Sequence, residues 1–149
     1  MPPRVLIVED EIVVAANLEA VLDDMGVSVT GIAPDAATAI ALAEKGADIA
    51  LVDLNLRDGL TGPEIGKKLS DAYGITVIFM TANPRIVADG VEGVLGVVPK
   101  PMQDDLVEPI VNFALYARSR QIADEEQKRR LSAIEPSAPP RGLQLFASA

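Results

Sequence analysis

The sequence predicts a doubly wound α/β domain, in which helices cover both faces of a mainly parallel sheet. Short apolar runs, mostly rich in β-branched residues, recur along the chain without clear polar alternation, as expected for strands that are covered on both faces. Amphipathic helical patterns separate these runs, and three of the patterns are followed by glycine, which favours helix termination. The alternation predicts five strands and five helices.

The expected strands differ in how much they are covered. Residues 27–30 alternate apolar and polar side chains, which is typical of a strand at a sheet edge. The other four strands are continuous apolar runs and are expected to be covered on both faces, at residues 5–8, 49–52, 75–80 and 94–98.

The expected helices are bounded by proline and glycine. Glycines follow the first three, and prolines open the second and third, where the missing N–H is tolerated. The helix at 84–89 is the shortest, and Pro109 lies near the start of the last one, where proline is least disruptive. The five segments are residues 11–25, 34–45, 63–73 and 84–89, and a final helix capped by Asp104 or Asp105.

The C-terminal part of the chain differs from the rest. The last helical pattern continues past Tyr116 to about Leu131 as a highly charged stretch, and the prolines beyond it disfavour helix. An apolar cluster follows at residues 142–146. We therefore expect a domain at residues 4–118 and, at 119–149, a charged helical extension with a proline-containing tail. The charged helix could simply be solvated, or the apolar tail residues could dock on the chain's own surface or on another copy.

Composition excludes several kinds of chemistry. The chain of 149 residues contains no histidine and no cysteine, so it cannot use either as a nucleophile, bind zinc through them or form a disulfide. A net charge of −9 opposes binding to nucleic acid. No apolar run approaches the roughly 20 residues that span a bilayer, so we expect a cytoplasmic protein without membrane attachment.

Polar residues stand at the carboxyl ends of four expected strands. Glu9 and Asp10 follow the first, Asp53 ends the third, Thr81 ends the fourth and Lys100 follows the fifth. Parallel strands end on one side of a sheet, where α/β folds bind ligands. Clustered carboxylates attract Mg²⁺, and an aspartate beside the ion can accept a phosphoryl group. Each residue alone could be a helix cap or a loop residue, but their joint placement favours a phosphoryl-transfer site.

The stretches that hold these residues resemble the receiver domain of two-component response regulators. They are residues 5–11, 51–56, 79–82 and 98–101, in the order and spacing of that family. The resemblance covers roughly residues 4–118. It implies a flavodoxin-like fold with a five-stranded sheet in the order 2-1-3-4-5 and five surrounding helices.

The resemblance also implies a role for each acidic residue. Asp53 would be the phosphoacceptor, and Asp10 would ligate Mg²⁺ directly. Glu9 would bind the ion through water or from the outer shell, and the backbone carbonyl of Asn55 would complete the protein ligands.

Two further residues would bind the phosphoryl group itself, Thr81 by a hydrogen bond and Lys100 by an ion pair. The implied donor is a histidine kinase or a histidine phosphotransfer protein, which suits a chain without histidine. The output would be contact with a downstream protein, and a homodimer could form.

Some features differ from the usual family pattern. Val97 stands where members usually carry Tyr or Phe, so the aromatic side chain that reports movement of the hydroxyl is missing. Arg57 stands where proline is common. Residues 79–82, Phe-Met-Thr-Ala, are partly similar to the subgroup named for a Phe-Ala-Thr-Gly motif. No output domain follows in the sequence, which is typical of a stand-alone receiver.

Two other functions stay open from the sequence. A pseudo-receiver would keep the fold and bind proteins without accepting phosphate, but the complete set of acceptor-site residues argues against it. An aspartyl-phosphate phosphatase would need a further general acid and a cap or substrate pocket, and the sequence indicates neither. We therefore expect a signalling phosphoacceptor and not an enzyme, with at most self-catalysed phosphorylation and dephosphorylation.

Overall fold

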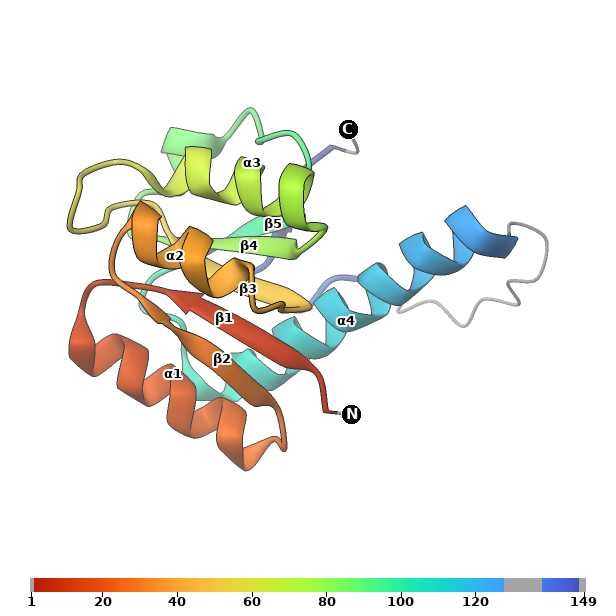
Figure 1. The fold of residues 1–149 in the computed structure, drawn as a ribbon, viewed down its shortest axis with the longest axis horizontal. Coiled ribbons are helices and arrows are strands. Elements are labelled where there is room, and N and C mark those ends of the chain that lie inside the picture. The colour runs from red at the N-terminus through yellow and green to blue at the C-terminus, as the bar shows by residue number, and fades with distance from the viewer. Residues whose placement is uncertain (1, 128–137, 148–149) are drawn as a thin grey trace.

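The computed structural model describes residues 2–127 and 138–147 and places helices on both faces of a twisted sheet (Figure 1). Within the described residues the elements are β1 (Arg4–Val8), α1 (Ile12–Asp24), β2 (Ser28–Ala33), α2 (Ala36–Ala43), β3 (Ile49–Asp53), α3 (Gly62–Tyr73), β4 (Thr76–Thr81), the 3₁₀ helix η1 (Pro84–Val87), β5 (Gly96–Pro99), α4 (Asp104–Gln127) and β6 (Gln144–Leu145).

The strand order in the sheet is β2-β1-β3-β4-β5-β6. The first five strands are parallel, as predicted, and their predicted order is confirmed. The sixth pairs antiparallel with β5, which would be an edge strand in the predicted five-strand order. The core of the fold is therefore the predicted flavodoxin-like sheet with one added strand.

Alternate residues of each central strand enter two separate apolar layers. In β1, Leu6 and Val8 face a layer that α2 and α3 cover, whereas Val5 and Ile7 face a layer that α1 and α4 cover. All four are fully buried. Burial on both faces explains why the sequences of these strands are continuous apolar runs.

The prediction of five strands and five helices is wrong in two places. Residues 84–89, expected to form a helix, contain only the 3₁₀ helix η1 over four residues. Gly90 follows almost at once with a positive φ of 82°, a backbone conformation that ends helical geometry. The sixth strand was missed because two residues are too few to produce an alternating pattern.

The last helix, α4, begins at Asp104, one of the two expected caps, and runs to Gln127. Its first half packs on the sheet through Val107, Ile110 and Val111, and its second half extends past the sheet (Figure 1). The expected end near Leu131 lies outside the described residues. No helix in the described part of the chain is long and apolar enough to cross a membrane.

Candidate functional site

The candidate site lies at the carboxyl ends of four neighbouring strands. Because β1, β3, β4 and β5 are adjacent and parallel, the residues that end or follow them meet on one side of the sheet. Asp53 and Thr81 are the last residues of β3 and β4. Glu9 and Lys100 follow β1 and β5 directly.

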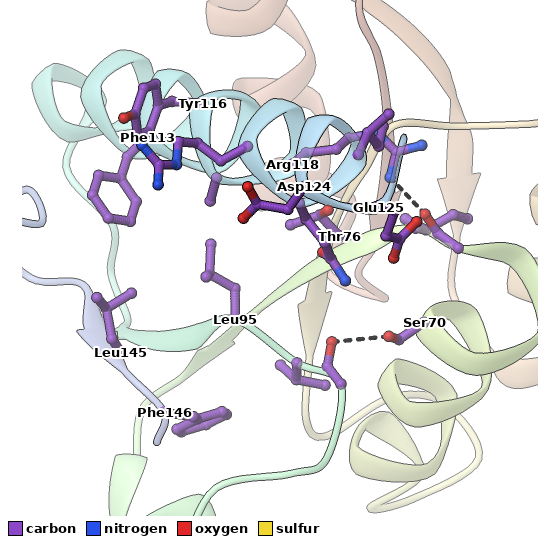
Figure 2. Close-up of a pocket in the computed structure, with 18 of the residues that line it drawn as sticks. Ser70, Thr76, Leu95, Phe113, Tyr116, Arg118, Asp124, Glu125, Leu145 and Phe146 are labelled. Atoms are coloured by element: carbon purple, nitrogen blue, oxygen red, sulfur yellow. Dashed lines mark hydrogen bonds between the residues drawn. The ribbon is translucent and has the colours of Figure 1, made fainter. Parts of the chain in front are cut away.

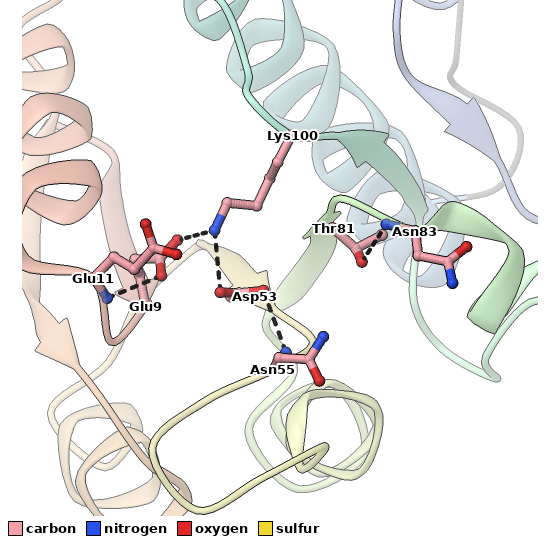
Figure 3. A network of polar contacts seen from close by, with 7 residues as sticks. All are labelled: Glu9, Glu11, Asp53, Asn55, Thr81, Asn83 and Lys100. Atoms are coloured by element: carbon pink, nitrogen blue, oxygen red, sulfur yellow. Dashed lines mark hydrogen bonds and ion pairs between the residues drawn. The ribbon is translucent and has the colours of Figure 1, made fainter.

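A buried ion pair network connects three of these residues (Figure 3). The ammonium of Lys100 donates to Glu9 Oε1 at 2.8 Å and to Asp53 Oδ2 at 3.2 Å. The side chains are only 16% (Lys100), 0% (Glu9) and 7% (Asp53) exposed. Charges so far removed from water depend strongly on one another, since an unpaired charge there is costly.

The carboxylates of Glu9, Asp10 and Asp53 form a group that fits a divalent cation. Each offers one oxygen, and the three oxygens lie within 4.8 Å of one another. Oxygen ligands with this much negative charge suit Mg²⁺, which binds through a few carboxylates and retains several waters. Asp10 is half-buried, so the group is open to solvent on one side.

Burial and neighbouring charges shift the pKa values of Glu9 and Lys100. It raises the pKa of Glu9 to about 7, although the hydrogen bonds from Lys100 and from the backbone N–H of Glu11 act in the opposite direction; the nearby charge of Asp53 raises it further. Burial alone would lower the pKa of Lys100, but the hydrogen bonds and charges of Glu9 and Asp53 outweigh it, so that pKa is raised. Lys100 therefore stays a cation at neutral pH.

The pKa of Glu9 predicts how the stability of the metal-free protein changes with pH. The pKa of Glu9 is about 7 in the folded chain, above its ordinary value of 4.5, so the folded state binds more protons between these values. The stability contribution of this group is fully present below pH 4.5 and is lost as pH rises through 7. We expect urea denaturation in EDTA to give a smaller loss of stability from pH 5 to 8 in Glu9→Gln than in the wild type. Equal losses in the two proteins would contradict the prediction.

The loop after β3 holds Asp53 in place. The backbone N–H of Asn55 donates to Asp53 Oδ1 at 3.3 Å, while the side chain of Asn55 is exposed. Together with the Lys100 contact, this fixes both carboxylate oxygens of Asp53.

Thr81 is buried beside the network without joining it. Its Oγ accepts a hydrogen bond from the backbone N–H of Asn83 at 3.0 Å (Figure 3). The backbone N–H of Lys100 donates to the carbonyl oxygen of Thr81 at 2.8 Å, which ties the ends of β4 and β5 together. Over the described ranges, no hydrogen bond joins the Thr81 side chain to Asp53 or Lys100.

Sequence reasoning assigned no role to Asp58, which anchors the loop after β3. It accepts hydrogen bonds from the hydroxyl of Thr61 at 2.6 Å and from the backbone N–H of Ala36 at 3.1 Å. These two bonds lower the pKa of Asp58. The Asp58-Gly59 pair, a common turn sequence, was the available signal.

Gly62 was also missed, and it sets how closely α3 approaches the acceptor strand. A Cβ at this position would lie 2.4 Å from both the carbonyl oxygen of Asp53 and the Cα of Leu54. Both contacts are with backbone atoms, which cannot rotate away. The only sequence signal was a glycine directly before a proline at a helix start.

We therefore expect Gly62→Ala to destabilise the fold by about 2 kcal/mol or more, because the methyl group must push α3 away from β3. Intrinsic helix propensity would act in the opposite direction. Gly31→Ala is the matched control. The three atoms nearest its Cβ would all belong to the side chain of Leu42, which can shift more easily than backbone, so this change should cost about 1 kcal/mol or less. Urea denaturation measures both, and equal effects would contradict the backbone contact.

Comparisons with known proteins show the family of this chain. Residues 5–112 match the family model described as the response regulator receiver domain. The chain is 31% identical over 119 residues to the phyllosphere-induced regulator PhyR of Methylorubrum extorquens, over 78% of this chain and 45% of the relative.

Two solved structures of PhyR proteins are similar to this chain in sequence and in fold. The response regulator PhyR from Brucella abortus is 28% identical with a TM-score of 0.76, over 87% of this chain and 54% of that one. The PhyR receiver domain from Erythrobacter litoralis is 29% identical with a TM-score of 0.70, over 77% of this chain and 91% of that one. The chain thus spans about half the length of the Methylorubrum and Brucella proteins, at 45% and 54%.

Proposed function

Because the chain belongs to the response regulator receiver family, we propose that it accepts a phosphoryl group on Asp53 and signals through contact with a downstream protein. The observation that supports this most is the buried contact between Asp53 and Lys100 beside two further carboxylates. The chain has no histidine, so the proposed donor is a phosphohistidine on a histidine kinase or a phosphotransfer protein.

In the proposed reaction Asp53 is the nucleophile. One of its carboxylate oxygens forms a bond to phosphorus while the P–N bond of the donor's phosphohistidine breaks, and the donor leaves as a neutral or protonated imidazole. The contacts from Lys100 and from the Asn55 N–H fix the direction of the carboxylate before attack. This fixed direction reduces the entropy lost on reaching the transition state.

Mg²⁺ would be held by Glu9, Asp10 and Asp53, with the backbone carbonyl of Asn55 as the remaining protein ligand. When bound, the ion would supply positive charge that offsets the charge of the transferred phosphoryl group. Lys100 would exchange part of its contact with Glu9 and Asp53 for a phosphoryl oxygen while keeping its proton.

Thr81 would bind another phosphoryl oxygen. Its Oγ already accepts from the Asn83 N–H, and a hydroxyl that accepts one hydrogen bond can still donate its own hydrogen. The loop that begins at Ala82 and Asn83 would therefore move with Thr81 when the hydroxyl reorients.

The direct test is the response to Mg²⁺ with beryllofluoride, which mimics a phosphoryl group on aspartate. We expect the two together to raise the melting temperature by several degrees, since a ligand that binds only the folded state stabilises it. Asp10→Ala should reduce this response strongly, and Asp53→Asn should remove it. A folded wild type that does not respond would be a pseudo-receiver. Turnover of small phosphate esters would instead indicate an enzyme.

A further inference from the structure

The described tail residues continue the sheet past β5. Leu145 of β6 pairs with Gly96, and Gln144 pairs with Val97, in antiparallel register. The backbone N–H of Phe146 donates to the carbonyl oxygen of Leu95 at 3.0 Å. Residues 143–146, here called the tail strand, thus satisfy backbone groups that an edge strand would otherwise expose.

Gly96 makes room for the tail strand. A Cβ at this position would lie 2.3 Å from the carbonyl oxygen of Gln144, 3.1 Å from its carbonyl carbon and 3.1 Å from Cδ1 of Leu143. All three nearest atoms belong to the tail strand. Because Gly96 has no side chain, the tail strand can lie this close to β5.

The side chains of the tail strand enter both apolar layers of the domain. Leu143 is buried in the layer of α1 and α4. Phe146 packs on the layer of α2 and α3, where its ring lies 6.2 Å from that of the fully buried Phe79, at an interplanar angle of 59°. A Cβ on Gly90 would also lie 3.4 Å from both the Cβ and the Cγ of Phe146.

The attachment is nevertheless small. Within the tail strand, β6 itself is only two residues long, and Leu145 is 40% exposed. Leu145 and Phe146 border a groove of about 750 Å³ whose other walls include Leu95, Phe113 and Tyr116 (Figure 2). A short strand with a partly exposed side chain beside an open groove detaches at low free energy compared with the core.

We propose that the edge of β5 is a docking site for an extended apolar segment of a partner protein, and that the tail strand is its intramolecular occupant. The fitting segment adds antiparallel to β5, places an aliphatic side chain where Leu143 lies and carries an aromatic side chain three residues later, where Phe146 lies. The partner binds only when the tail strand has left, so the tail lowers the apparent affinity of the site. This inference does not require phosphorylation of Asp53.

The test uses the full chain and a labelled peptide with the sequence of residues 140–147, Pro-Arg-Gly-Leu-Gln-Leu-Phe-Ala. The double variant Leu143→Ser/Phe146→Ser releases the tail and opens the site. We expect fluorescence anisotropy to show the peptide binding this variant at least about tenfold more tightly than the wild type. A peptide with serine in place of phenylalanine should lose most of this binding.

Gly96→Ala supplies the matched control. Added to the open variant, it should weaken peptide binding at least about tenfold, because its methyl group occupies the path of the incoming backbone. In the otherwise wild-type chain, it should increase hydrogen exchange at the Phe146 amide while core amides stay protected. This second readout applies even where the double variant does not fold.

Three results would overturn the proposal. The first is a folded open variant that does not bind the peptide. The second is binding that Gly96→Ala leaves unchanged, together with an unchanged Phe146 amide. The third is a dimer of the wild type that is lost in the double variant, because it would assign the edge of β5 to the tail of a second copy.

Discussion

Asp53→Asn is expected to reduce phosphorylation by acetyl phosphate or by a cognate kinase at least about 100-fold, with the fold retained. Asparagine keeps the shape of the side chain, but its single amide oxygen can accept only one of the two hydrogen bonds that Lys100 and the Asn55 N–H donate to Asp53. Its amide is not a nucleophile toward phosphorus. The measurement is incorporation of labelled phosphate, with circular dichroism to verify folding.

Asp58→Asn is the matched control for this prediction. Asp58 is an exposed carboxylate in the loop just after the proposed acceptor, so a label transferred without selectivity would reach it as well. Its replacement should leave phosphorylation within about twofold of the wild type. Undiminished, hydroxylamine-sensitive labelling of Asp53→Asn would assign the acceptor to another residue.

Lys100→Gln is expected to destabilise the metal-free chain by about 3 kcal/mol at pH 8. Removing the ammonium leaves the buried carboxylates of Glu9 and Asp53 without a cation, and breaking a buried ion pair from one side is strongly destabilising. Saturating Mg²⁺ should recover a large part of this loss, because the ion supplies positive charge to the same carboxylates. Phosphotransfer should also slow, because the proposed phosphoryl contact is lost.

The control for this variant is Lys68→Gln, which removes an exposed lysine on α3. Exposed charges contribute little, so its stability should change by less than about 0.5 kcal/mol and should not depend on Mg²⁺. Urea denaturation in EDTA and in excess Mg²⁺ provides the comparison. A Lys100→Gln loss that Mg²⁺ does not reduce would contradict the shared use of these carboxylates.

Much of the fold could be predicted because its signals are local. The strands that are covered on both faces are continuous apolar runs, and the charged or hydroxyl side chains stand directly after them, as Asp53 does after Val52. Parallel pairing then brings the strand ends together whatever the details of each loop. Glu9, Asp53 and Lys100 are in contact for that reason.

The parts that could not be predicted depend on contacts between distant residues. Leu145 of the tail strand pairs with Gly96, nearly a third of the chain away. A strand of two residues has no local sequence pattern from which it could be predicted. The 84–89 segment carries helix-forming residues, but the glycines that follow it shorten it to a 3₁₀ helix. The hydrogen bond from the Asn83 N–H to Thr81 is likewise a property of the folded loop.

The shortness of β5 has a thermodynamic consequence. Lys100, at the carboxylates, lies four positions after Gly96, which is under the tail strand, a distance of roughly 13 Å along a strand. If ligand binding at one end of β5 changes the equilibrium at the other by some factor, linkage requires the reverse effect to have the same factor. A tail release favoured fivefold by beryllofluoride would therefore appear as a beryllofluoride affinity five times higher in the tail-free state than in the tail-bound state.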